Sequence, residues 1–306
     1  MQKTLYQQNM DKLGLDEHDL FEFEFKKIIF FVNSLSVMYE KDDLLDERSL
    51  LLRSIRRMTR LMESIDVIYE NTQERASMMI LTRSIIDINA TICFLFKYVT
   101  DHTERTLRIL LFFLDGIRTR MKLSDFPMKP RDERYISEDE YCAIFEQREA
   151  TRSADMKAEK DILEMIEKSP LYPRMNHLII EKANWRYRSL KSKGDYSWRD
   201  LYEMVCGDES WAMFEQVYLS QYVHGVAIAD IQSDSIVETN PMFSLNMCNS
   251  TLKMLEQILK IWFFGEYENL ENAYKQNVGP SLLMNLPQAT ISEYIQRYEE
   301  NYKSKT

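Results

Sequence analysis

Apolar residues recur every three to four positions along most of this chain, which is the spacing of one face of an α-helix. The clearest case is the segment 46–70, whose apolar face consists of Leu51, Ile55, Met58, Met62, Ile65 and Tyr69. The segment 72–98 is apolar on nearly every face, a pattern typical of a helix surrounded by others. Further helices are predicted over 16–39, 103–121, 175–184, 197–206, 208–224, 242–265 and 292–302. The sequence therefore predicts an all-α multi-helix bundle with a central buried helix near 72–98.

A long and mostly charged helix is predicted over 137–168. Ser137 and Glu140 have the spacing of a capping box, in which each residue satisfies an N–H group at the start of the helix. Two prolines precede this helix and make 127–135 the best hinge candidate. We expect one helical domain over 1–306. The charged helix either projects from its surface or lies on it.

Composition supports this fold class. Only 7 Gly and 7 Pro occur among 306 residues, so turn-forming residues are scarce and a many-stranded sheet is disfavoured. The 39 basic and 49 acidic residues give a net charge of −10, which repels polyanions. Nucleic-acid binding would therefore need a local basic patch.

Cysteine usage and apolar run length give the expected location. The four cysteines are far apart in sequence, which is typical of reduced thiols rather than of a disulfide framework. The longest apolar runs, such as 28–32 and 109–114, are too short to cross a bilayer, and the acidic run 16–19 does not fit a signal peptide. We expect a soluble cytoplasmic protein without membrane contact.

Arg83 and Asp87 form a polar pair, four positions apart, in the apolar segment 72–98. Charged side chains are rarely buried without a partner, so the favoured interpretation is an ion pair that fixes helix packing. The alternative is that Arg83 points into a pocket and binds an anion through its planar guanidinium group.

A second polar cluster consists of Tyr218, Ser220 and His224, followed by Gly225. A lone histidine on a helix is more often a core residue than a catalyst, so that interpretation is favoured here too. If this helix meets Arg83 and Asp87, the five side chains would form a ligand-binding centre, with His224 as the candidate acid–base catalyst.

The Arg-Ser-x-x-acid pattern at 83–87, Trp198 and Trp211, and the pattern Tyr-x-Ser-x-x-x-His-Gly at 218–225 resemble an uncharacterised bacterial helical family, a domain of unknown function. In this chain the named residues of the last pattern are Tyr218, Ser220, His224 and Gly225. The resemblance covers about 45–265, and family members usually carry Glu where this chain has Asp87. It implies a shared Arg–acid–His cluster without an assigned activity. Some relatives are loosely similar to helical nuclease or phage-defence domains, which is an analogy of fold.

Two basic features are weaker candidates for nucleic-acid contact. One is a stripe on the predicted helix 46–70, consisting of Arg53, Arg56, Arg57 and Arg60. The other is the basic and aromatic segment 182–199, which includes Arg186, Arg188 and Trp198. We favour a solvated, ion-paired face for the first and an ordinary packed loop for the second.

Motifs for established chemistries are not found in the sequence. It contains no Glu-x-x-His, His-Glu-x-x-His, Cys-x-x-Cys or glycine-rich phosphate loop, so neither a metal nor a cofactor is predicted. No histidine is preceded by an arginine at the four to six positions that helical defence nucleases need. The first hypothesis is therefore a ligand- or partner-binding module, with a small molecule, a protein or a second copy of the chain as partner. The alternative is a hydrolase or nuclease of phage defence that uses His224 as acid–base and Arg83 as phosphate anchor.

Overall fold

The computed structural model describes residues 16–41, 43, 45–126, 130–132, 134–223 and 242–277. These residues form helices and no β-strand, with one isolated bridge between Tyr187 and Asp195, so the all-α prediction is confirmed. Contacts divide the chain into two compact units. The first unit contains residues 1–93 and 202–306, and the second unit contains residues 94–201.

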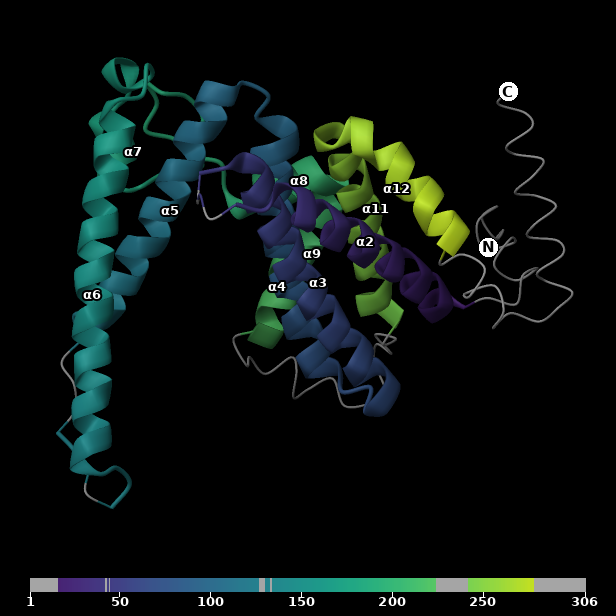
Figure 1. The fold of residues 1–306 in the computed structure, drawn as a ribbon, viewed down its shortest axis with the longest axis horizontal. Coiled ribbons are helices and arrows are strands. Elements are labelled where there is room, and N and C mark those ends of the chain that lie inside the picture. The colour runs from purple at the N-terminus through teal and green to yellow at the C-terminus, as the bar shows by residue number, and fades with distance from the viewer. Residues whose placement is uncertain are drawn as a thin grey trace, which may run out of the picture. The chain divides into compact units, whose positions relative to one another are not determined.

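The first unit is a bundle built around α4 (Figure 1). Its helices are α2 (Glu17–Tyr39), α3 (Glu47–Asn71), α4 (Arg75–Cys93), α9 (Glu209–Val223), α11 (Met242–Trp262), α12 (Phe264–Asn277) and the last residues of α8 (Trp198–Cys206). Helix α4 packs against α3, α9 and α11, and α11 also packs against α2. The predicted central helix therefore lies among three others, as its apolar faces require.

Helix α4 continues directly into a short π-helix, η1 (Phe94–Tyr98), where the second unit begins. Among the described residues, the segment Arg75–Tyr98 is the one helix long and apolar enough to cross a membrane by length and composition. Within the structure, 61% of its most apolar window is buried. The core helix of a soluble protein passes the same test.

Local capping explains where several helices begin. Asp46 accepts a hydrogen bond from the backbone N–H of Ser49 at the start of α3. Ser137 and Glu140 form the predicted capping box at the start of α6 (Glu138–Glu167). Each side chain satisfies a backbone N–H that lacks an acceptor within the helix, so these boundaries could be predicted from short sequence patterns.

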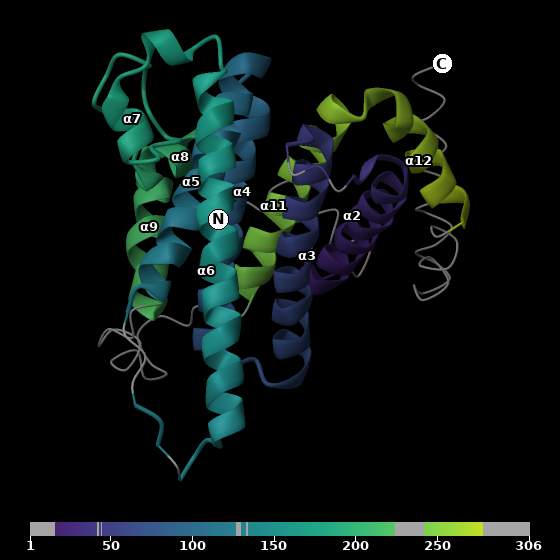
Figure 2. The ribbon, with the colours of Figure 1, turned by 60° about the vertical axis from the view of Figure 1, so that its left-hand side comes forward.

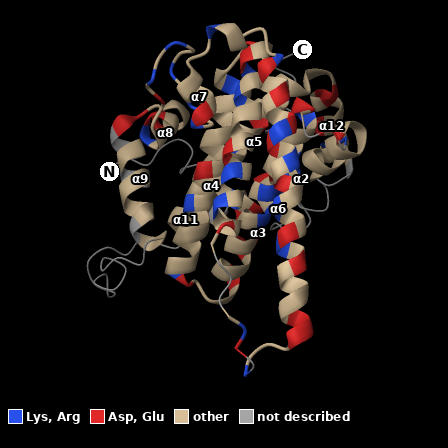
Figure 3. Ribbon diagram, turned by 90° about the vertical axis from the view of Figure 1, so that its left-hand side faces the viewer, with Lys and Arg blue, Asp and Glu red and all other residues tan. Residues whose placement is uncertain are grey.

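The second unit contains η1, α5 (His102–Ser124), α6, η2 (Tyr172–Arg174), α7 (His177–Glu181) and the beginning of α8. Helices α5 and α6 pack side by side (Figure 2). Along α6 only Asp155 and Ile166 are buried, and both acidic and basic residues cover its surface (Figure 3). The buried Asp155 carboxylate accepts a hydrogen bond of 2.7 Å from Nε of Arg120 on α5. The expectation that this charged helix lies at a surface agrees with its exposure.

The C-terminal part of the first unit differs from the prediction. The helix expected over 242–265 ends at Trp262, and a second helix, α12, runs on to Asn277. Gly265 lies in the first turn of α12 instead of terminating a helix. Tyr267 and Tyr274 hold α12 on α2, because both rings contact Phe31 at centroid distances of 5.0 and 6.4 Å.

The helix predicted at 292–302 lies outside the described residues, as do residues 127–129 and 133 of the hinge candidate and His224 and Gly225 of the second polar cluster. The single-domain organisation stays a prediction. The four cysteines Cys93, Cys142, Cys206 and Cys248 are all free thiols.

Candidate functional site

Helix α4 places Arg83 and Asp87 one turn apart, and they form an ion pair with 3.3 Å between Nε of Arg83 and Oδ2 of Asp87. Tyr202 on α8 completes this group. Its hydroxyl donates a hydrogen bond to Asp87, and the Arg83 guanidinium lies over its ring at 5.1 Å from the centroid. The residue that joins the charge pair to a neighbouring helix is therefore Tyr202, which no sequence pattern singled out.

The group is only partly satisfied. The side chain of Arg83 is 14% exposed, and its buried Nη1 has no hydrogen-bond partner among the described residues. Burial raises the pKa of Asp87, while the hydrogen bond from Tyr202 and the charge of Arg83 oppose that rise. A buried donor without an acceptor costs free energy, which distinguishes Arg83 from an arginine whose donors are all satisfied.

A cavity of about 500 Å³ adjoins this group, between α4, α8 and α11 of the first unit. Tyr202 lines it, so one side chain contacts both the cavity and the charge pair. The apolar lining residues are Ile86, Ala90, Val205, Phe243, Met247 and Met254. The volume lies within the range of small-molecule sites, and such sites are commonly lined in this way, by apolar side chains with a few polar ones.

The polar lining residues lie both inside the cavity and at its edge. Asn89 and Thr251 are 5% and 3% exposed, whereas Asn246 and Ser250 are exposed to solvent. The hydroxyl of Thr251 makes no hydrogen bond within the part of the chain that the structure describes. An apolar cavity with an available inner hydroxyl can hold a ligand that has an apolar body and one hydrogen-bonding group.

The second predicted cluster lies on α9, which packs against α4, so the structure brings the two helices together. Within the part of the chain that the structure describes, neither Tyr218 nor Ser220 forms a hydrogen bond with Arg83 or Asp87. Tyr218 shares a hydrogen bond of 3.0 Å with Tyr222, and the Ser220 hydroxyl donates to the carbonyl of Gln216 in its own helix. His224 lies outside the described residues, so the hydrolase or nuclease alternative stays a prediction.

Two arginines of the basic stripe on α3 form hydrogen bonds to residues 40–43, which precede the helix. Arg56 forms two hydrogen bonds to the Glu40 carboxylate, at 3.1 and 2.6 Å, and Arg53 donates to the backbone carbonyls of Lys41 and Asp43. Arg57 and Arg60 are exposed. These contacts agree with the favoured interpretation of a solvated and ion-paired face.

In the basic and aromatic segment the rings are largely inside the second unit. Trp185 is 4% exposed and packs edge-on against Trp198 at 6.2 Å. The Arg186 guanidinium lies 5.1 Å from the Trp198 ring, and Arg188 forms a 2.9 Å ion pair with Asp200. Stacking of nucleotide bases needs accessible ring faces, so this packing favours the packed-loop interpretation.

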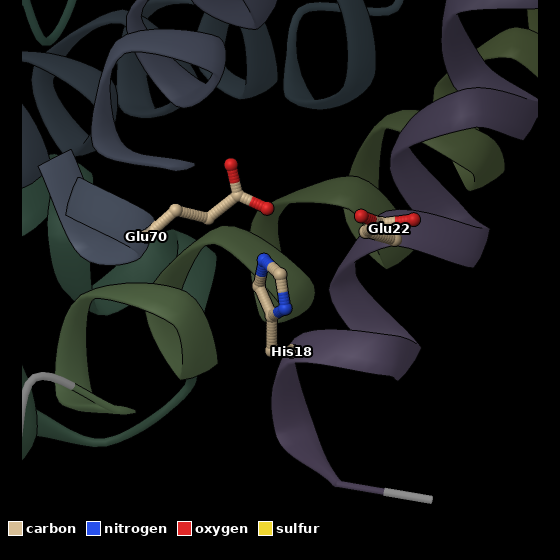
Figure 4. Close-up of side chains that lie close together, drawn as sticks. All are labelled: His18, Glu22 and Glu70. Carbon is tan, nitrogen blue, oxygen red and sulfur yellow. The ribbon is translucent and has the colours of Figure 1, made fainter. Parts of the chain in front are cut away.

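A group of metal-ligating side chains occurs elsewhere in the first unit. His18 and Glu22 on α2 and Glu70 on α3 place one ligand atom each within 4.8 Å of the others (Figure 4). Sequence motifs did not reveal this group, because its members come from two helices. The spacing of His18 and Glu22, one helical turn apart, was the only local signal.

Comparisons of the chain with protein-family models, with curated proteins and with solved structures find no match. The function must therefore be inferred from the geometry of the chain itself.

Proposed function

We propose that the first unit is a small-molecule-binding module whose ligand occupies the cavity between α4, α8 and α11. The observation that carries this proposal is the cavity itself, about 500 Å³ in volume, with Tyr202 as a wall. Binding cavities are usually largely formed before the ligand arrives. The proposal keeps the hypothesis of a binding module that includes Arg83 and Asp87, and it puts Tyr202 in the place of Tyr218, Ser220 and His224.

The lining sets the class of ligand. Met247 and Met254 are unbranched and adaptable, which suits an apolar body of variable shape. Thr251 and Asn89 offer hydrogen bonds on the inner side, so the ligand carries at least one donor or acceptor. A small amphipathic molecule with an aromatic or branched aliphatic body fits this description.

In this proposal Arg83 and Asp87 are positioning residues. Asp87 holds the hydroxyl of Tyr202, and Arg83 covers its ring, so together they fix the wall that the ligand touches. A rigid wall lowers the entropy lost on binding. Their contacts therefore support affinity without direct contact with the ligand.

The test uses phenylnaphthylamine, a neutral apolar fluorophore with one N–H group, titrated into the full chain. Ala90→Phe adds a ring at a position that lines the cavity and is 1% exposed. We expect its affinity for the fluorophore to fall by at least about tenfold, which corresponds to about 1.4 kcal/mol. Ser250→Phe places a ring at the exposed edge with less risk to folding and should weaken binding in the same direction.

Ile80→Phe is the matched control, because Ile80 lies on the same helix, is 40% exposed and does not line the cavity. It should bind the fluorophore like the wild type. Circular dichroism confirms that each variant is folded. Equal affinities for the wild type, folded Ser250→Phe and Ile80→Phe would mean that the cavity is not the binding site and would refute the proposal.

A further inference from the structure

We propose that His18, Glu22 and Glu70 bind a divalent transition-metal ion, with Zn²⁺ as the best fit. This site lies between α2 and α3 and is independent of the ligand cavity. Figure 4 shows the imidazole of His18 between the carboxylates of Glu22 and Glu70. A mixed set of one imidazole and two carboxylates is typical of zinc and of other first-row metals, whereas magnesium and calcium prefer oxygen ligands alone.

The spacing of the ligand atoms suits one ion. All three lie within 4.8 Å of one another. Zinc ligands lie about 2.0–2.2 Å from the ion, so two ligands of a tetrahedral site are about 3.4 Å apart. Glutamate side chains can rotate to close the difference without a change in the backbone. Two ligands one turn apart on α2 and a third on α3 then converge from two packed helices.

Asp66 supports the His18 ring. Its Oδ1 lies 2.7 Å from Nε2 of His18, and it precedes Glu70 by one turn on α3. A metal-bound histidine usually donates its other ring N–H to a carboxylate, which orients the ring. Asp66 takes this role when Nδ1 of His18 binds the ion. The Tyr69 ring, 5.0 Å from the imidazole, packs against the histidine as well.

The local charge favours a cation. Three carboxylates, from Glu22, Asp66 and Glu70, surround one imidazole. Lys26 forms an ion pair with Glu22. The Lys26 side chain is 46% exposed, and exposed ion pairs contribute little to stability. A divalent ion can therefore displace this contact at low cost. The side chains of His18 and Asp66 are 18% and 21% exposed, which leaves the site open to ions from solvent.

The experiment is isothermal titration of the metal-free full chain with Zn²⁺, with Mg²⁺ as comparison. We expect one Zn²⁺ site whose affinity falls at least about 100-fold in His18→Ala. In Asp66→Asn, where only the supporting carboxylate is lost, it should fall about 10–100-fold. Glu70→Gln changes an exposed side chain with little risk to folding and should weaken Zn²⁺ binding by at least about tenfold. Mg²⁺ should bind much more weakly than Zn²⁺.

Matched controls separate this site from surface binding. His177→Ala removes an exposed histidine, and Glu63→Gln removes an exposed carboxylate from α3, so neither should change the affinity. Co²⁺ provides a spectroscopic test: its visible bands should appear without a thiolate charge-transfer band, because no cysteine is a ligand. A thiolate band, equal affinity for Zn²⁺ in wild type and Glu70→Gln, or no binding by the wild type would overturn the proposal.

Discussion

Arg83 of the first unit and Arg108 of the second unit have the same kind of sequence environment. Each lies on a helix with a buried apolar face, and each has an acidic residue four positions away, Asp87 after Arg83 and Glu104 before Arg108. Their surroundings in the fold differ. Arg108 is 3% exposed, and all three of its guanidinium nitrogens donate hydrogen bonds, whereas Nη1 of Arg83 is buried without a partner among the described residues.

The partners of Arg108 explain its role. It donates to Glu104 at 2.6 Å and to the backbone carbonyls of Trp185 and Tyr187 at 2.8 and 3.0 Å. The guanidinium also lies 3.8 Å from the Tyr187 ring centroid, in cation–π contact. These contacts fasten the aromatic loop onto α5. The same four-residue spacing, in opposite order, therefore accompanies a saturated structural arginine in one unit. In the other unit it accompanies an arginine whose buried Nη1 has no partner among the described residues and which covers the ring of Tyr202, a residue that lines the cavity.

The largest expected effect comes from Arg108→Met. This change leaves two buried carbonyls without donors and removes the cation from two aromatic rings, so we expect a loss of about 3 kcal/mol in the free energy of unfolding. Urea denaturation followed by tryptophan fluorescence measures it, since Trp185 lies beside the substitution. Arg134→Met is the control, because Arg134 is exposed and its contacts with the Asp132 carboxylate and the exposed Tyr135 ring lie at the surface. A loss below about 1 kcal/mol would break the distinction between the two arginines.

Features that depend on neighbouring residues could be predicted from the sequence. The α6 helix begins where the Ser137–Glu140 pair predicts, because capping is a matter of three or four residues. The central position of α4 follows from its apolar faces. Helix α12 was missed because Gly265 indicated an end, while the burial of Tyr267 and Tyr274 depends on contacts with α2.

The candidate sites depend on contacts between residues far apart in sequence. Tyr202 reaches Asp87 across 115 residues, and Arg108 reaches Trp185 across 77. His18 meets Asp66 across 48 residues. Spacing along one helix shows which side chains share a face, but not which distant backbone or ring satisfies them. The pair Arg83–Asp87 could therefore be found from sequence, whereas the cavity beside Tyr202 could not.

Alkaline pH sharpens the comparison through Tyr187. Burial raises the pKa of Tyr187 to about 12, and the nearby charge of Arg108 limits the rise. The pKa of Tyr187 in the folded state exceeds the unfolded value of about 10, so the protonated side chain favours the folded state. This contribution to the free energy of unfolding is complete below about pH 10 and is lost as the pH rises towards 12. We expect the wild type to lose roughly 2 kcal/mol more than Tyr187→Phe across that window, by urea denaturation at several pH values.

The control for this titration is Tyr135→Phe, because Tyr135 is 82% exposed and its replacement should leave the alkaline slope unchanged. At neutral pH, Tyr187→Phe should keep or slightly increase stability, since the buried Tyr187 hydroxyl has no hydrogen-bond partner among the described residues. Parallel alkaline slopes for the wild type and Tyr187→Phe would show that the ring is not held in the buried position beside Arg108.

The smallest expected effect comes from Arg83→Met. Removing Arg83 also removes its buried, unsatisfied Nη1, and Asp87 keeps the hydrogen bond from Tyr202 while its side chain is 35% exposed to water. We therefore expect the free energy of unfolding to change by less than about 1 kcal/mol, measured under the same conditions as Arg108→Met. Fluorophore affinity should fall nonetheless, because the Tyr202 ring loses the cation that covers it. A loss of stability as large as that of Arg108→Met, with unchanged fluorophore affinity, would make Arg83 a second structural arginine and remove its link to the cavity.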